Sequence, residues 1–278
     1  MLASYRRLPR VISGDREFGS APAFSKSAMS EILQSTTVHP NHLLARLSAD
    51  DRKLLGPHLD VVTRLQGHVI HEAGDEVEHV YFPHDGMVSL LAVMRNGKAI
   101  ETATVGREGV VGAMAGLDLY KSMARAVVQL PMVCSQISAA RFRHALGASR
   151  SVERICIRYN EVLLSQARIT AACNALHPVD ARFCRWLLQT ADRAGSATVG
   201  LTQEFLSEML GVRRTSVTDV AGKLQKDGVI SFTRGVIQIL DRSRLEALSC
   251  ECYQSLIDQS ATLGRHSTGK VASPAVLR

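Results

Sequence analysis

The stretch LTQEFLSEMLGVRRTSVTDVAGKLQKDGVI, residues 201–230, decides the fold of the C-terminal part of the chain. It predicts a short helix that starts after the N-cap residue Thr202, a turn at Gly211, and a second helix that ends at Asp227 and Gly228. Apolar side chains recur in the second helix at steps of three and four residues, so we expect one of its faces to be buried. The opposite face carries small, polar and cationic side chains, which suits the groove of a nucleic acid.

The residues that follow, VISFTRGVIQILD (229–241), predict a hairpin with its tip at residues 233–235. Two helices joined by a turn and followed by a hairpin form a winged helix-turn-helix. Its second helix fits a major groove about 12 Å wide, where an arginine binds guanine through two hydrogen bonds, while the wing reaches a phosphate. The sequence therefore predicts DNA contacts from Thr202, Gln203, Arg213, Arg214, Thr215, Ser216, Thr218, Asp219 and Arg234.

Residues 61–137 have a different character, because short β-rich runs alternate with turn signals. Hairpin turns are expected at Gly74–Asp75, Asp85–Gly86 and Asn96–Gly97. Many short strands at this regular spacing indicate an antiparallel sandwich, barrel or roll. With helices on both sides of this region, the chain is predicted to be an α+β protein.

A long helix is predicted over residues 148–176, after the β-rich domain (39–147) and before the winged domain (177–250). Its apolar-leaning positions recur in steps of three and four, as in the seam of a coiled coil. A helix that packs on its own domain has the same spacing, but we favour a dimer seam in which the polar Gln166 sets the register. The seam comprises Val152, Ile155, Tyr159, Val162, Gln166, Ile169 and Cys173.

The two ends of the chain have the composition of irregular segments. Residues 1–38 are expected to be a mobile arm, and residues 251–278 the end of a helix followed by a disordered basic tail. No apolar run approaches the ~18 to 20 residues of a membrane span and no secretory signal is visible, so we expect a cytoplasmic protein. The net charge of +7 favours acidic partners such as DNA. The six cysteines form no C-x-x-C motif, and Cys250 and Cys252 alone are a weak signal, so no metal site is predicted.

Over residues 44–248 the chain resembles the Crp/Fnr family of bacterial transcription regulators. The resemblance rests on HEAGDEVEHVYFPHDGMVSLL, on VGREGVVG, on LTQEFLSEMLGVRRTSV followed by LQKDGVI, and on TRGVIQILDRSRLEAL. It implies an antiparallel β-roll like that of cyclic-nucleotide-binding domains, a long dimerising helix and a C-terminal winged helix-turn-helix. It also implies a homodimer on a pseudo-palindromic double-stranded operator, with recognition helices about 34 Å apart. RNA polymerase is a further candidate partner.

Departures from the family motifs bear on the signal. Members that bind cyclic AMP carry a Gly-Glu pair and, further on, an Arg-Ser-Ala or Arg-Thr-Ala triplet whose arginine pairs with the phosphate. The matching triplet here lacks that arginine, so cyclic AMP is disfavoured, and either another small-molecule effector or none is expected. No cysteine precedes Cys134, which disfavours the iron–sulfur cluster of the family's oxygen sensors, while a haem sensor stays open. The candidate effector pocket comprises Gly106, Arg107, Glu108, Gly109, Ser122, Met123 and Ala124.

The recognition helix also departs from the cyclic AMP-responsive pattern, Ser-Arg-Glu-Thr-Val-x-Arg. The matching residues, 213–219, keep the central arginine as Arg214. Thr215 stands in place of the glutamate and Asp219 in place of the last arginine. Because acidic side chains accept a hydrogen bond from cytosine N4, we expect a different half-site.

Alternatives from other classes stay open. His68, His71, His79 and His84 gather in the β-rich region, as in a cupin-like metal-dependent enzyme. However, His68 and His71 are three apart on a predicted strand and so face opposite ways, and the H-x-H motif of cupins is absent. We therefore predict that the protein is not an enzyme. A dimeric regulator that needs no ligand, or a dimeric scaffold that has lost DNA binding, would share the same fold.

Overall fold

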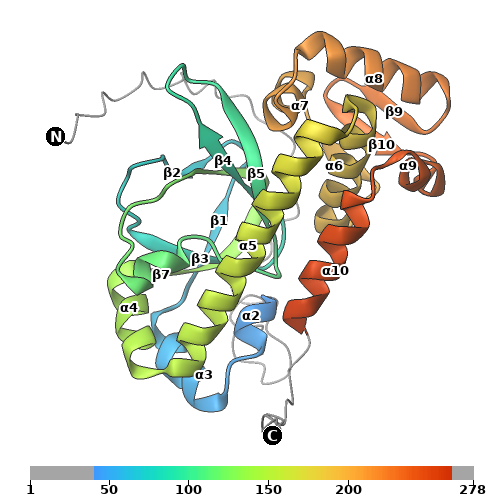
Figure 1. Cartoon of the computed structure of the whole chain (residues 1–278). Coiled ribbons are helices and arrows are strands. Elements are labelled where there is room, and N and C mark those ends of the chain that lie inside the picture. The colour runs from blue at the N-terminus through green and yellow to red at the C-terminus, as the bar shows by residue number, and fades with distance from the viewer. Residues whose placement is uncertain (1–40, 265–278) are drawn as a thin grey trace, which may run out of the picture.

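The computed structural model describes residues 41–264, which form a β-roll, a long helix beside it and a small winged C-terminal domain (Figure 1). The predicted α+β class, with an antiparallel β-roll followed by a winged helix-turn-helix, is confirmed. The arm predicted over residues 1–38 lies outside the described residues, as do residues 265–278 of the predicted tail. Among the described residues, no helix has both the length and the apolar character that crossing a bilayer requires.

Two antiparallel sheets make up the β-roll, in the orders β1-β7-β3 and β2-β6-β4-β5. Asn96–Gly97 closes the hairpin between β4 and β5, as predicted. The other two turn predictions are wrong as hairpins, because Gly74–Asp75 and Asp85–Gly86 each carry the chain from one sheet to the other. The strands are β1 (Asp60–Arg64), β2 (Val69–His71), β3 (His79–Pro83), β4 (Met87–Val93), β5 (Ala99–Val105), β6 (Arg125–Leu130) and β7 (Met132–Ser138).

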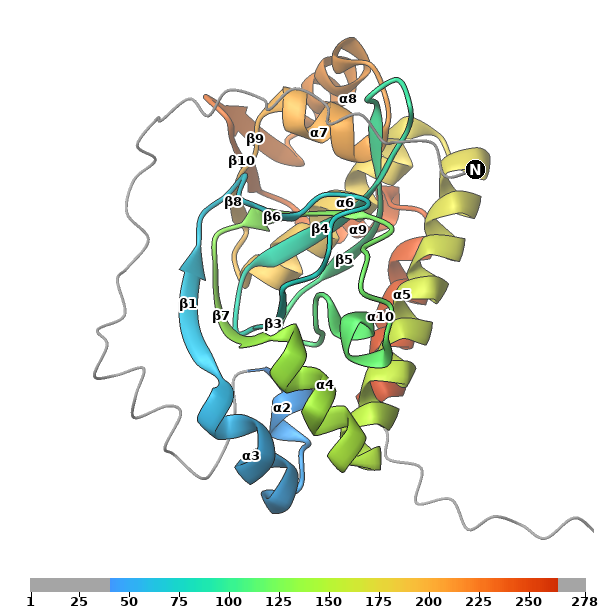
Figure 2. The ribbon, with the colours of Figure 1, turned by 90° about the vertical axis from the view of Figure 1, so that its left-hand side faces the viewer.

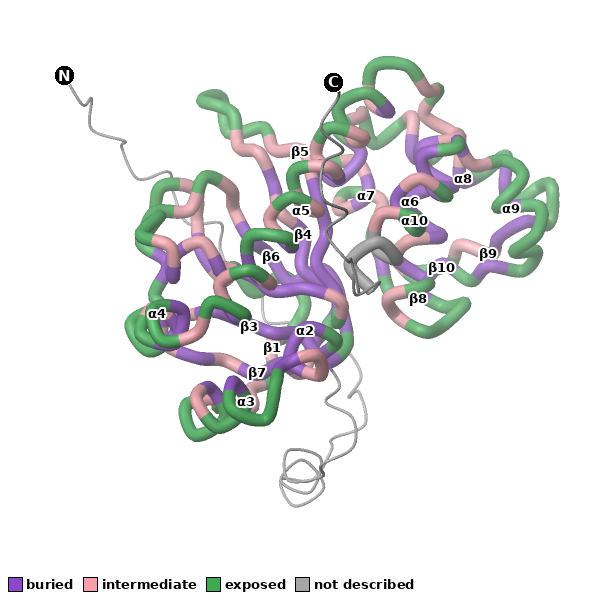
Figure 3. Tube along the Cα trace, turned by 60° about the horizontal axis from the view of Figure 1, so that its bottom comes forward, coloured by how far each residue is buried: buried purple, intermediate pink, exposed green. Residues whose placement is uncertain are grey.

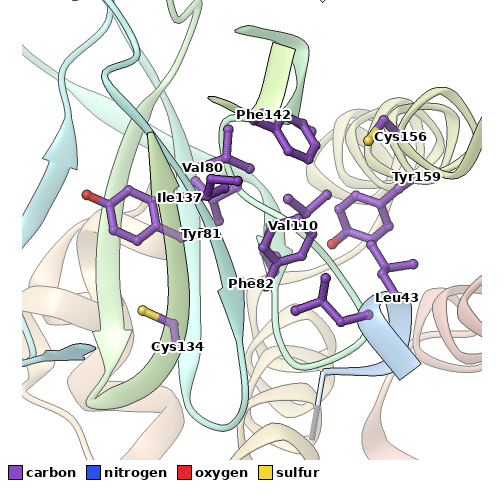
Figure 4. Close-up of a cluster of buried hydrophobic side chains, with 14 of the residues drawn as sticks. Leu43, Val80, Tyr81, Phe82, Val110, Cys134, Ile137, Phe142, Cys156 and Tyr159 are labelled. Carbon is purple, nitrogen blue, oxygen red and sulfur yellow. The ribbon is translucent and has the colours of Figure 1, made fainter. Parts of the chain in front are cut away.

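Helices close one end of the roll and complete its core (Figure 2). Figure 4 shows Leu43, Phe82, Val110, Phe142 and Tyr159 meeting there, each at most 4% exposed. Phe82 and Phe142 meet edge to face with ring centres 5.9 Å apart, a favourable aromatic geometry. The helices at this end are α2 (His42–Ala45), α3 (Ala49–Leu55), the 3₁₀ turns η1 (Gly56–His58) and η2 (Ala113–Leu117), and α4 (Ala139–Ala148).

Helix α5 (Arg150–Leu176) is the predicted long helix, and most of its predicted dimer seam is covered within the protomer. Its heptad face packs inside the protomer: Tyr159 lies against Gly109, and Gln166 Oε1 accepts a hydrogen bond from the Thr104 backbone N–H (3.2 Å). The spacing of three and four correctly identified a buried face, but such spacing does not say what covers that face. Four seam positions are at most 4% exposed: Val152, Tyr159, Gln166 and Cys173. The other three are partly buried: Ile155, Val162 and Ile169.

The winged domain has the predicted order of elements. Thr202 caps α7, since its hydroxyl accepts from the Phe205 N–H (3.2 Å), and Gly211 turns the chain at φ +64°. The wing tip, Arg234 and Gly235, has positive φ at both residues, as a two-residue hairpin turn requires. The elements are α6 (Val179–Ala194), β8 (Thr198–Gly200), α7 (Gln203–Leu210), α8 (Arg214–Lys226), β9 (Ile230–Thr233), β10 (Val236–Ile239) and α9 (Arg242–Leu248).

The chain continues into a last helix, α10 (Cys252–Gly264), that lies alongside α5 (Figure 1). The helix end predicted within residues 251–278 is a helix that extends to Gly264. The physical reason is a short apolar stripe, because Cys252, Tyr253 and Leu256 are all at most 8% exposed. The stripe gives the helix a buried face despite the basic composition of the residues after it.

A buried polar junction joins the β-roll to the winged domain. Glu101 of β5 accepts a hydrogen bond from Trp186 Nε1 of α6 (2.9 Å), and its Oε2 lies 2.6 Å from Ser89 Oγ of β4. Gln129 of β6 lies beside them and directs its Nε2 at Thr190 Oγ1 of α6 (3.4 Å). Apolar contacts continue the junction, and Figure 3 shows the buried positions running along the strands toward α6.

Burial raises the pKa of the Glu101 carboxyl to about 7, against the opposing effects of the Ser89 hydrogen bond and the Arg185 charge. The hydrogen-bond arrangement agrees with a proton on this group. Ser89 Oγ lies within hydrogen-bond reach of both Glu101 Oε2 and Gln129 Oε1, yet a hydroxyl has one hydrogen to donate. A protonated Glu101 donates to Ser89, which is then free to donate to Gln129.

We expect the Glu101→Gln variant to change how stability depends on pH. Folded wild-type protein holds more protons on Glu101 than the unfolded chain does between pH 4.5 and about 7, so its stability falls as pH rises through that window. Because a tenfold change in proton affinity is worth about 1.4 kcal/mol, the loss is on the order of 3 kcal/mol. Glutamine reproduces the protonated acid and removes this loss, which urea denaturation across the window will measure.

The matched control is Glu204→Gln, which removes the same charge at an exposed position in the first turn of α7. Its stability should follow the wild-type pH dependence. Parallel stability curves for wild type and Glu101→Gln would contradict a protonated carboxyl at the junction.

Candidate functional site

The recognition helix α8 has one buried and one exposed face, as the sequence predicts. Val217, Ala221 and Leu224 are at most 3% exposed and anchor the helix in the domain core. The predicted DNA-contact residues lie on the other side of the helix or next to it. Those that are exposed are Thr202, Arg213, Arg214, Thr215, Thr218, Asp219 and Arg234, while Gln203 and Ser216 are partly buried.

Two contacts join these residues into one surface. Thr218, one turn into α8, donates a hydrogen bond from its hydroxyl Oγ1 to Gln203 Oε1 at the start of α7 (3.1 Å). At the other edge, a Cβ added at Gly235 in the wing tip would lie 3.7 Å from Thr202 Cγ2. The start of α8, the start of α7 and the wing therefore form a continuous surface, which we call the arginine face after Arg213, Arg214 and Arg234.

The guanidinium groups of the arginine face are not tied up in ion pairs within the described part of the chain. Among residues 41–264, none of Arg213, Arg214 and Arg234 forms an ion pair, whereas Lys223 farther along α8 lies 3.9 Å from Asp180. Arg213 is the N-cap residue of α8 and makes no side-chain cap, so the first backbone N–H groups of the helix stay available. Free guanidinium groups beside a helix N-terminus suit an anionic ligand with phosphates and base edges.

The turn between α7 and α8 rests on the β-roll. A Cβ added at Gly211 would lie 2.6 Å from Ile100 Cδ1 on the β4–β5 hairpin, so the two surfaces are in close contact. Figure 1 shows this hairpin rising beside α7. The β-roll therefore helps to set the orientation of the arginine face.

The first candidate effector stretch, residues 106–109, faces α5 and α6. Glu108 Oε1 accepts from Arg193 Nη2 of α6 (3.0 Å) and from the Gly106 N–H (3.0 Å). Burial alone would raise the pKa of the Glu108 carboxyl, but the Arg193 charge and these hydrogen bonds bring it below its ordinary value. The Tyr159 ring fills the space next to Gly109.

Arg107 of the same stretch is exposed. Glu108 is thus engaged by the winged domain. Sequence reasoning did not identify Arg193, whose only signal is a basic residue in the last turn of α6.

The second candidate stretch, residues 122–124, has other neighbours. Ser122 exchanges backbone hydrogen bonds with Gly74 and Asp75, its hydroxyl donates to the Ala124 carbonyl (2.7 Å), and Met123 is 92% exposed. Two cations flank the stretch: Arg125 is paired with Glu72 (2.7 Å), and Lys121 is exposed.

A hollow of about 390 Å³ lies next to this second stretch. Asp75, Glu76 and Glu78 line it together with His71 and His79. Carboxylates in the lining of a hollow repel a phosphate, so this part of the roll is poorly suited to bind an anion.

Histidines of the β-roll do not assemble an enzyme-like metal site. His84 Nε2 lies 2.8 Å from Ser135 Oγ, and burial lowers the pKa of His71. Within the described part of the chain, the one group of His, Cys, Asp or Glu side chains at metal-binding distances lies elsewhere, beside α5 and α10.

Comparison with known proteins matches both halves of the molecule. The family model of the cyclic nucleotide-binding domain matches residues 62–149, and that of the Crp-like helix-turn-helix domain matches residues 181–248. The HTH-type transcriptional regulator Cmr of Mycobacterium tuberculosis is 26% identical over 206 residues, which is 73% of this chain and 82% of that protein.

Solved structures share the fold. A Crp/Fnr-family transcriptional regulator from Eubacterium rectale superposes with a TM-score of 0.61 at 19% identity, covering 75% of this chain and 98% of that one. FixK2 from Bradyrhizobium japonicum gives a TM-score of 0.59 at 18% identity, covering 69% of this chain and 98% of that one.

The two matched domains fall on the β-roll and the winged domain, and together they span more than half of the chain. The cupin-like enzyme alternative is therefore wrong. The chain is a transcription regulator, not an enzyme, and it belongs to the Crp/Fnr family.

Proposed function

We propose that the protein acts as a homodimer on a pseudo-palindromic DNA duplex, with α8 of each protomer in a major groove. The observation that carries this proposal is the arginine face, where three unpaired guanidinium groups share one surface with the starts of α7 and α8. Arg214 is the residue assigned to guanine, and Arg234 on the wing is assigned to a phosphate. Asp219 then accepts a hydrogen bond from the N4 amino group of a cytosine, either on the opposite strand or in a neighbouring base pair.

The outer face of α5 supports the homodimer. Ile157, Leu164 and Ala171 recur every seven residues and are exposed, the first two by 50% and 43%. Glu161 and Arg168 flank this stripe and pair with each other (2.9 Å). A seven-residue repeat of exposed apolar side chains on a 27-residue helix suits a coiled-coil contact with a second copy.

A signal other than cyclic AMP is part of the proposal. Two features support it: the pairing of Glu108 with Arg193, and the acid-lined hollow beside Ser122. A cyclic phosphate would need a cation that the second stretch does not supply. Contact with RNA polymerase stays a prediction.

We expect Arg214→Ala to remove sequence-specific DNA binding. Duplexes selected from a random library by the wild-type protein serve as the probe, and fluorescence anisotropy measures the affinity of each variant. Loss of one bidentate contact per half-site costs roughly 1–3 kcal/mol and relaxes the base preference at that step. Arg234→Ala should instead weaken all duplexes about equally and lessen the salt dependence.

Arg150→Ala is the control for charge removal, because Arg150 is exposed at the far end of α5 from the arginine face. It should leave affinity and base preference unchanged. Wild-type affinity of Arg214→Ala for the selected duplexes would rule out the assignment of the recognition helix.

Leu164→Glu should dissociate the dimer. At a seam position two copies of the new carboxylate would face each other without a partner, at a cost of about 3 kcal/mol, or about 100-fold in the dimer dissociation constant. Sedimentation equilibrium measures this constant, and Leu119→Glu is the control because Leu119 is 56% exposed on the β-roll. A Leu164→Glu protein that remains as dimeric as the control would refute the proposed seam.

A further inference from the structure

Four side chains of metal-ligand type meet at the hinge between α5 and α6. Cys173 lies in the last turn of α5, and His177 follows that helix. Cys250 precedes α10, and Cys252 is its first residue. Their ligand atoms all lie within 4.8 Å of one another. The three sulfurs are buried, and His177 is partly buried.

The distances within this cluster fit one tetrahedral ion. Cys173 Sγ lies 3.5 Å from Cys250 Sγ, and Cys252 Sγ lies 3.6 Å from His177 Nδ1. In a tetrahedral zinc site with Zn–S of about 2.3 Å and Zn–N of about 2.0 Å, the ligand atoms are about 3.8 Å (S to S) and about 3.5 Å (S to N) apart. Three thiols and one imidazole are a common structural zinc set.

A second, independent contact orients the histidine. His177 Nε2 lies 3.1 Å from Glu251 Oε1, on the side of the ring away from Cys252. A carboxylate on the outer nitrogen fixes the tautomer that leaves Nδ1 free to bind a metal, an arrangement that recurs around protein zinc sites.

The surroundings supply positive charge. Arg182 and Arg185 of α6 are at most 6% exposed. Both guanidinium groups interact electrostatically with Cys173. Cations offset the net negative charge that three thiolates leave around a divalent ion.

We propose that Cys173, His177, Cys250 and Cys252 bind one zinc-type divalent ion in a closed site that fastens α10 to the α5–α6 hinge. Four protein ligands leave no position for a substrate, so the role of the site is structural. Ligand atoms that converge on one point favour a single ion, since in a four-iron cluster the ligands bind different irons. The ion would tie together the long helix, the first helix of the winged domain and the C-terminal helix.

Metal analysis of the full chain tests this proposal. Protein purified anaerobically with a thiol reductant and no chelator should contain one zinc per chain by mass spectrometry. Cobalt(II) reconstitution should give the visible absorption of a tetrahedral thiolate site. Cys250→Ser should lose the metal, whereas Cys156→Ala, at a buried cysteine outside the cluster, should keep it.

Glu251→Gln keeps the test decisive if Cys250→Ser does not fold, because the Glu251 side chain is 77% exposed. We expect zinc affinity to fall about 10- to 100-fold in chelator competition, with an unchanged circular dichroism spectrum. Equal affinity in wild type and Glu251→Gln would overturn the assignment of His177 as a ligand. Three further results would each overturn the zinc site: no stoichiometric metal, iron with acid-labile sulfide, or a Cys173–Cys250 disulfide in protein alkylated anaerobically.

Discussion

The arrangement of the two domains depends on the polar side of α6. Trp186, Thr190 and Arg193 direct donors and acceptors from this helix toward the β-roll, where Glu101 lies buried and Glu108 partly buried. Buried carboxyls are costly unless they are hydrogen-bonded, neutralised or paired, and α6 meets this need in two different ways. Glu101 favours its proton, and Glu108 keeps its charge against an arginine. This junction, with the contact between Ile100 and Gly211, fixes the angle at which α8 is presented.

Helix α5 then serves several neighbours with different faces. One face completes the core of the roll through Tyr159 and Gln166, and another lies along α10. The stripe of Ile157 and Leu164 is exposed in the protomer. A helix that is apolar on more than one side makes several contacts, and a heptad-like repeat alone does not say which of them it serves. This is why the seam-like repeat in the sequence also marks a face that packs inside the protomer.

Local chemistry predicted much of the winged domain. Helix caps and turns depend on contacts within a few residues, so the local sequence determines them. Examples are Thr202 as the cap of α7, Gly211 in the left-handed conformation, and Asp227–Gly228 after α8. The exposed side of α8 followed from the same periodicity. Long-range features were not predictable in this way. The turns Gly74–Asp75 and Asp85–Gly86 have ordinary hairpin chemistry, yet only the tertiary fold decides that they join different sheets.

The same distinction applies to the candidate sites. Arg193 lies 85 residues from Glu108, and Cys173 lies 77 residues from Cys250, so no short motif could connect either pair. A C-x-C sequence and a helix-ending histidine each carry a weak signal alone. The fold supplies the information by bringing the end of α5 and the start of α10 together.

The hydrophobic core of the winged domain has a consequence for how the molecule can be divided. Leu91 and Val127, from strands of the roll, belong to the same buried cluster as Phe183, Leu187 and Leu188 of α6. A chain cut between α5 and α6 would leave apolar surface exposed on both fragments. The two halves are therefore one cooperative unit and not interchangeable modules, and a chimaera between regulators would need to exchange α6 together with the β4–β6 face that it covers.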